Sequence, residues 1–106
     1  MKSIKIILKM HQISNYDKRQ LDLMMQQLNR FENGEIDLFS LQSSLEFLFQ
    51  AMEYVNDFLE NSFLEEISTL ASINADPPND KQINVKVIIA ETVENLKNLV
   101  KQAASP

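Results

Sequence analysis

The sequence predicts a mainly α protein, a small antiparallel bundle of about four helices in a single domain spanning residues 1–106. Three observations favour this fold class. Apolar residues recur at spacings of three and four along most of the chain, which is the helical period. One Gly and three Pro leave little material for the tight turns of hairpin-rich β folds. A composition that is 44% apolar and 24% charged is adequate for one hydrophobic core and too apolar for disorder.

The first ten residues are the exception to the helical period, because apolar side chains alternate there with polar ones. Period two and β-branching are typical of a strand. A single strand cannot complete its hydrogen-bond ladder, so it needs a partner. The candidate partner is residues 83–89, where Ile and Val also alternate. An alternative fold class therefore remains open: α+β, with a short strand pair from residues 3–10 and 83–89.

The first helix is expected at residues 15–33. Ser14 or Asn15 can cap it, and Asp17 lies in its first turn, where the helix dipole favours negative charge. Asn33 and Gly34 end it, with Gly34 in the left-handed position that follows many helices. Its apolar face is formed by Leu21, Met24, Leu28 and Phe31, with Met25 beside them.

The second helix has a readable start, because Asp37 is an N-cap and Ile36 and Leu41 form a hydrophobic staple around it. Its apolar stripe then continues without a break to Leu70. One helix of more than about thirty residues is unusual in so short a chain. Asn56 and Asp57 are good cap residues and poor interior ones. We therefore expect a bend or break there, separating helices at residues 38–54 and 57–73.

The last helix is expected at residues 80–102, after a linker at Asp76-Pro77-Pro78 that disfavours helix. Asn79 or Asp80 can cap it. Its predicted buried stripe runs in helical register as Val85, Ile88, Ile89, Thr92, Leu96, Leu99 and Val100.

Charge is distributed unevenly along the chain. The stretch Phe31–Asp80 contains eleven carboxylates and no Lys or Arg, whereas both flanks are basic, and the net charge is −5. An acidic centre of this kind indicates a basic protein partner and argues against direct nucleic-acid binding, since phosphate contacts need clustered Lys and Arg.

No motif of an enzyme, cofactor site or metal site is present. His11 is the single His and there is no Cys, so a zinc site lacks ligands. Gly34 is the only Gly, which excludes Gly-rich phosphate loops. Glu65 and Glu66 are adjacent on a helix and do not face each other. No apolar run is long enough for a signal peptide or a membrane span, and with the lack of Cys this favours the cytoplasm.

One set of side chains is typical of a partner-binding face. If the helix continues far enough, the carboxylates at 46, 53, 57 and 60 fall on one side, away from the Leu stripe, and the aromatics at 39, 47 and 54 fall beside them. These aromatics either pack under another helix or lie exposed among the acids. Exposed, they would anchor a basic partner whose approach the acids steer. The candidate contact residues are Glu46, Phe47, Glu53, Tyr54, Asp57 and Glu60.

Two blocks of sequence resemble one family. They are Leu28-Asn29-Arg30-Phe31-Glu32-Asn33-Gly34-Glu35-Ile36-Asp37-Leu38 with Leu41, Leu45 and Leu48, and then Phe58 to Ile67, ending in Leu64-Glu65-Glu66-Ile67. Together they cover about half of the chain. They are similar to small helical immunity proteins of contact-dependent growth inhibition and related polymorphic toxin systems in bacteria. The resemblance implies an inhibitor without catalysis that binds one cognate toxin, in many systems a basic nuclease.

A second function stays open beside this one. The unbroken stripe from Leu41 to Leu70 also suits a helical oligomerisation or adaptor module, with a homodimer as its simplest form. That alternative depends on one long helix, whereas the inhibitor does not.

Overall fold

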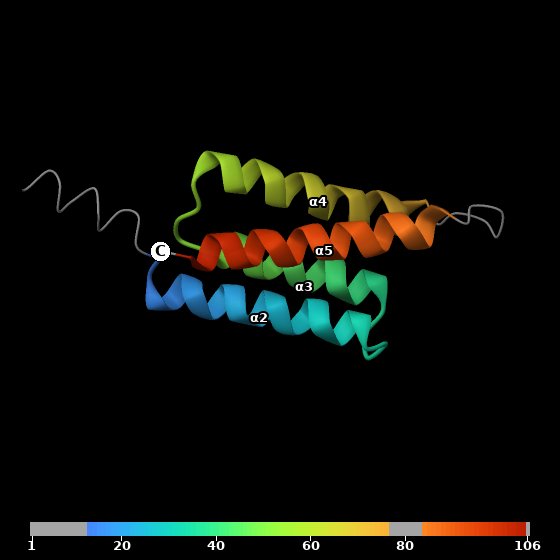
Figure 1. Cartoon of the computed structure of the whole chain (residues 1–106), viewed down its shortest axis with the longest axis horizontal. Helices are drawn as coiled ribbons and strands as arrows, with labels where there is room; N and C mark the ends of the chain where they lie inside the picture. Colours follow the sequence, from blue (N-terminus) through green and yellow to red (C-terminus); the bar gives the residue numbers. More distant parts are fainter. Residues whose placement is uncertain (1–12, 77–83, 106) are drawn as a thin grey trace, which may run out of the picture.

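The computed structural model describes residues 13–76 and 84–105, which form four α-helices and no strand. The helices are α2 (Asn15–Glu32), α3 (Leu38–Ala51), α4 (Asp57–Ala75) and α5 (Asn84–Ala104). They run antiparallel to their chain neighbours as a bundle (Figure 1). The predicted mainly α class is confirmed. Residues 84–89 are helical, so they do not form the strand of the alternative fold, and residues 3–10 and 83 lie outside the described ranges.

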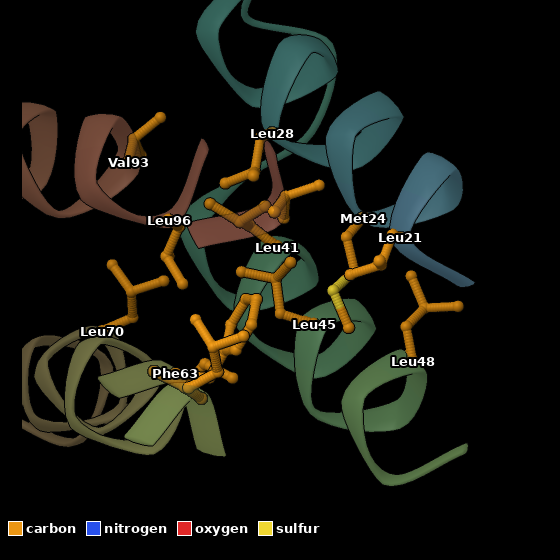
Figure 2. Close-up of a cluster of buried hydrophobic side chains, with 13 residues drawn as sticks. Leu21, Met24, Leu28, Leu41, Leu45, Leu48, Phe63, Leu70, Val93 and Leu96 are labelled. Carbon is orange, nitrogen blue, oxygen red and sulfur yellow. The ribbon is translucent and has the colours of Figure 1, made fainter. Parts of the chain in front are cut away.

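Each helix packs against two others. α2 lies against α3 and α5, and α4 lies against the same two, so the helices form a ring in chain order. Side chains from all four meet in the centre (Figure 2). Burying one Leu-sized side chain stabilises a fold by roughly 1.5–3 kcal/mol. The buried core consists of Leu21, Met24, Leu28, Leu41, Leu45, Leu48, Leu59, Phe63, Ile67, Leu70, Val93, Leu96 and Val100.

Three helices begin at side-chain caps, as predicted. Ser14 Oγ accepts the backbone N–H of Asp17 at 3.0 Å at the start of α2. Asp37 Oδ1 accepts the N–H of Ser40 at 2.8 Å, and Asn56 Oδ1 accepts the N–H of Leu59 at 2.9 Å. Each bond satisfies a backbone donor that the first helical turn leaves without a partner.

Two features of the helices differ from expectation in an informative way: the end of α3 and the buried face of α5. α3 ends at Ala51 rather than at residue 54, and five residues separate it from α4. In α5, Ile88 is exposed and Val93 is buried, so the predicted stripe was wrong at Ile88 and omitted Val93. The buried face is turned toward α2, where Lys97 of α5 contacts Glu32. Periodicity alone could not predict which side of α5 is buried, because apolar residues lie on both sides of the helix near its start.

Polar side chains join neighbouring helices around the ring. Asn74 of α4 donates to the Gln42 side chain of α3 at 2.6 Å. Asn95 of α5 donates to Glu66 of α4 at 3.0 Å. Between α3 and α4 the rings of Phe49 and Phe63 also pack, with centroids 5.2 Å apart. These contacts fix the register of α4 against both of its neighbours.

Candidate partner-binding surface

The carboxylate of Asp17 joins the start of α2 to the connection between α3 and α4. Its Oδ1 accepts the backbone N–H of Glu53 at 2.7 Å, and its Oδ2 accepts the N–H of Tyr54 at 3.1 Å. Asp17 is only 2% exposed. A buried carboxylate needs hydrogen-bond donors, and these two amides supply them. The sequence placed Asp17 in a favourable first-turn position but gave no sign of this second role.

These bonds explain why α3 stops before residue 54. In a continuing helix the N–H of Glu53 would bond to the carbonyl of Phe49, four residues back. Instead the N–H of Met52 bonds to that carbonyl, at 3.1 Å, and the N–H of Glu53 is taken by Asp17. Asn56 then caps α4 and starts a new helix in the opposite direction. The predicted break at Asn56 and Asp57 is confirmed.

The connection and the first turn of α4 display two aromatic rings among three carboxylates. Tyr54 is 56% exposed and Phe58 is 68% exposed. The acids Glu53, Asp57 and Glu60 are all exposed beside them in the chain. We call this set the junction surface: Glu53, Tyr54, Asp57, Phe58 and Glu60. Phe58 was not among the predicted residues, although its position on the side of α4 opposite Leu59 and Phe63 would have indicated it.

Glu46 and Phe47 do not belong to this surface. Glu46 is partly buried and accepts a hydrogen bond from the side-chain amide of Gln42. The side-chain oxygen of Gln42 in turn accepts a hydrogen bond from Asn74 of α4. Phe47 is 73% exposed and lines a hollow between α3 and α2. The predicted in-line arrangement with Glu53 and Tyr54 was therefore wrong. It assumed one helical register through residues 46–60, and the register is interrupted at Met52.

Among residues 13–76 and 84–105, no basic side chain forms an ion pair with the acids of the junction surface. Within the described residues the ion pairs are Arg30 with Glu35 and Lys97 with Glu32. Arg30 and Glu32 lie in the last turn of α2 and Lys97 lies within α5, so neither pair involves the α3–α4 connection. The three junction carboxylates are thus exposed and have no basic partner in the described part of the chain.

Other kinds of site find little support in residues 13–76 and 84–105. No group of three or more His, Asp or Glu side chains in these residues is placed to hold a metal ion. Every helix there falls short of the length or hydrophobicity that a membrane span requires. Glu66 lines a shallow hollow between α4 and α5, where Asn95 already bonds to it. His11 lies outside the described ranges.

Comparisons with protein-family models, with curated proteins and with solved structures gave no match for this chain.

Proposed function

We propose that this protein is a stoichiometric, non-catalytic inhibitor that binds a basic protein, and that it serves as the immunity protein of a bacterial toxin. One observation carries the proposal. Tyr54 and Phe58 are exposed beside three carboxylates that pair with no basic group among the described residues, and the backbone of the connection is fixed by the buried Asp17. The resemblance of residues 28–48 and 58–67 to immunity proteins supplies the biological role.

The junction surface has the composition of a binding hot spot for a basic protein. Aromatic rings supply large contact areas at the centre of an interface, and surrounding charges accelerate the encounter. Fixing the connection before binding also reduces the conformational entropy that association must otherwise remove. Asp17 does this by holding two successive amides, those of Glu53 and Tyr54.

The partner is a protein rather than a nucleic acid because α3, α4 and their connection contain no Lys or Arg. Carboxylates repel phosphates, and nucleic-acid binding needs basic side chains. A nuclease toxin is itself basic where it meets its substrate. An acidic inhibitor therefore suits the substrate-binding surface of such a toxin.

The proposal predicts that a toxin domain is encoded beside this protein, and the direct test is binding to that domain. The purified pair should form a 1:1 complex, and co-expression should abolish toxicity. Tyr54→Ala should raise the dissociation rate at least about tenfold, which corresponds to about 1.4 kcal/mol. Because Tyr54 is exposed, the melting temperature of the Tyr54→Ala protein should differ little from that of wild type. A wild-type chain that neither binds nor protects would overturn the function itself.

Charge reversal tests the steering role of the acids. Glu53→Lys should slow association, with its largest effect at low salt, since exposed charges are screened beyond about 8 Å at physiological ionic strength. Glu94→Lys on α5 is the matched control, because Glu94 is also exposed and the change of net charge is the same. Equal slowing by both variants would mean that net charge, not the junction surface, directs the encounter.

The alternative of a long-helix adaptor has lost the feature on which it depended. The stripe from Leu41 to Leu70 is divided between α3 and α4, which fold back on each other across the core. A coiled coil through that stripe would require both helices to leave the bundle.

A further inference from the structure

The solvent side of α3 differs from that of every other helix described. Its exposed side chains are Phe39, Ser40, Ser43, Phe47 and Gln50, and none is charged. The only charged residue of the helix, Glu46, is partly buried against the α4 side. α2, α4 and α5 each expose several Asp, Glu, Lys or Arg side chains. Phe39 and Phe47 are 65% and 73% exposed, which is a high cost for a face that meets only water.

The exposed aromatics follow a symmetric pattern. Phe39, Ser43 and Phe47 are spaced four residues apart and form one ridge along the helix, with the small Ser43 at its centre. On the side toward α2 this ridge borders a hollow of about 400 Å³, lined by Leu23, Gln27, Ser43, Ser44, Phe47 and Leu48.

We propose that the outer side of α3 is a homodimer interface, in which α3 of a second copy packs antiparallel with Ser43 at the two-fold axis. An isologous interface requires that if one residue contacts another, the reverse contact also occurs. A ridge with Phe at both ends and Ser in the middle satisfies this condition. Phe39 of the second copy then lies beside Phe47, next to the hollow, and Ser43 allows the two helix backbones to approach closely.

Charge selects a second copy over other occupants. Each chain has a net charge of −5, so contacts between the charged faces of two copies oppose like charges. The exposed side chains of α3 bring no charge to a contact between two copies. A basic partner gains no electrostatic attraction from an uncharged face, whereas the junction surface offers it three carboxylates. The two surfaces therefore suit different partners, and the dimer does not depend on the proposed inhibitor function.

A single cysteine tests the geometry, because the natural chain contains none. A disulfide forms when two Cα atoms come within about 4.4–6.8 Å, which a residue on the two-fold axis of closely packed helices can reach. Ser43→Cys should give a disulfide-linked dimer under mild oxidation. Ser68→Cys, at an exposed position of α4, is the matched control and should stay monomeric. Failure of Ser43→Cys to cross-link, or cross-linking of both variants at the same rate, would overturn the proposal.

Sedimentation equilibrium supplies an independent measurement on the unmodified chain. Wild type should dimerise, and Phe47→Ser should raise the dimer Kd by about a hundredfold, because each substitution removes two symmetric contacts of about tenfold each. Phe58→Ser removes an equally exposed ring from α4 and should leave the Kd unchanged. Both variants should keep the helical circular dichroism of wild type. A wild-type chain that is monomeric at about 1 mM would refute the interface.

Discussion

The two connections that the structure describes between helices are equally long and are stabilised in opposite ways. Between α2 and α3, residues 33–37 are held by bonds to near neighbours: the N–H of Gly34 bonds to the carbonyl of Phe31 at 3.0 Å, and that of Glu35 to Arg30 at 2.8 Å. Between α3 and α4, residues 52–56 are held by Asp17, which is 36 residues before Glu53. The first is a local structure that any chain with these residues can form. The second exists only when α2 packs beside α3.

The difference has a functional meaning. The locally encoded connection exposes no large aromatic side chain, whereas the long-range one displays Tyr54 and leads into Phe58. A connection that depends on the packed bundle presents its binding residues only in the folded protein. Asp17, a buried residue of α2, thereby positions the junction surface, which is formed by the α3–α4 connection and the start of α4.

Removing the Asp17 carboxylate should cause the largest loss of stability, and it should do so by releasing the α3–α4 connection. Asp17→Ala leaves the amides of Glu53 and Tyr54 without their acceptors. Each unsatisfied, partly buried amide costs about 1–3 kcal/mol, so the free energy of unfolding should fall by roughly 2–6 kcal/mol. Urea denaturation measures the loss, and hydrogen exchange should accelerate at Glu53 and Tyr54.

Asp17→Asn refines this test, because an amide oxygen can accept only in place of one of the two carboxylate oxygens. Its loss of stability should lie between those of wild type and Asp17→Ala. Even the Asp17→Ala molecules that remain folded should bind the proposed basic partner more weakly than wild type does. If the amides of Glu53 and Tyr54 exchanged at the wild-type rate in Asp17→Ala, the α3–α4 connection would be a local structure like the α2–α3 connection.

Gly34→Ala should be the next largest change. Gly34 has a φ of 77°, which is unfavourable for residues with a Cβ. A Cβ built there meets no atom within 4 Å, so the cost is backbone strain alone, about 1–2 kcal/mol. Gly34→Asn should cost less, since Asn tolerates the left-handed region. Partner binding should be unchanged, which distinguishes this connection from the α3–α4 one; a loss of affinity here would contradict that distinction.

Removing the α4 cap should have a smaller effect. Asn56→Ala leaves the N–H of Leu59 without its acceptor and should lower the free energy of unfolding by about 1 kcal/mol. Asn56→Asp is the control, because a carboxylate also caps and favours the helix dipole. If Asn56→Ala cost as much as Asp17→Ala, the connection would depend mainly on its own cap.

The smallest effect concerns pH at the start of α3. The backbone N–H and the hydroxyl of Ser40 donate to Asp37 and lower the pKa of its carboxyl below the ordinary value. A carboxyl whose pKa is lower in the folded state stabilises the fold above its unfolded-state pKa, and this contribution is lost as the pH falls below about 4. Asp37→Asn should retain a cap and remove this part of the pH dependence of the melting temperature. An unchanged acid limb would show that other carboxyls account for it.

Most of the helical framework could be predicted because its signals act over four residues or fewer. The caps Ser14, Asp37 and Asn56 bond to amides three positions ahead, and the stripes repeat every three or four residues. The same reasoning found the exposed Tyr54 but placed it on a helix with Glu46 and Phe47, since nothing local ends α3 at Ala51. No Gly or Pro occurs between Leu38 and Asp76.

The sequence by itself determined the starts of α2, α3 and α4, the core residues of α3 and α4, and the acidic character of the centre of the chain. Only the tertiary structure decided that Asp17 is buried, that it ends α3 by taking the amides of Glu53 and Tyr54, and that Phe47 lies apart from both. The physical reason is distance along the chain. A carboxylate binds donors 36 and 37 residues away only after hydrophobic burial has brought α2 against α3 and removed the competing water.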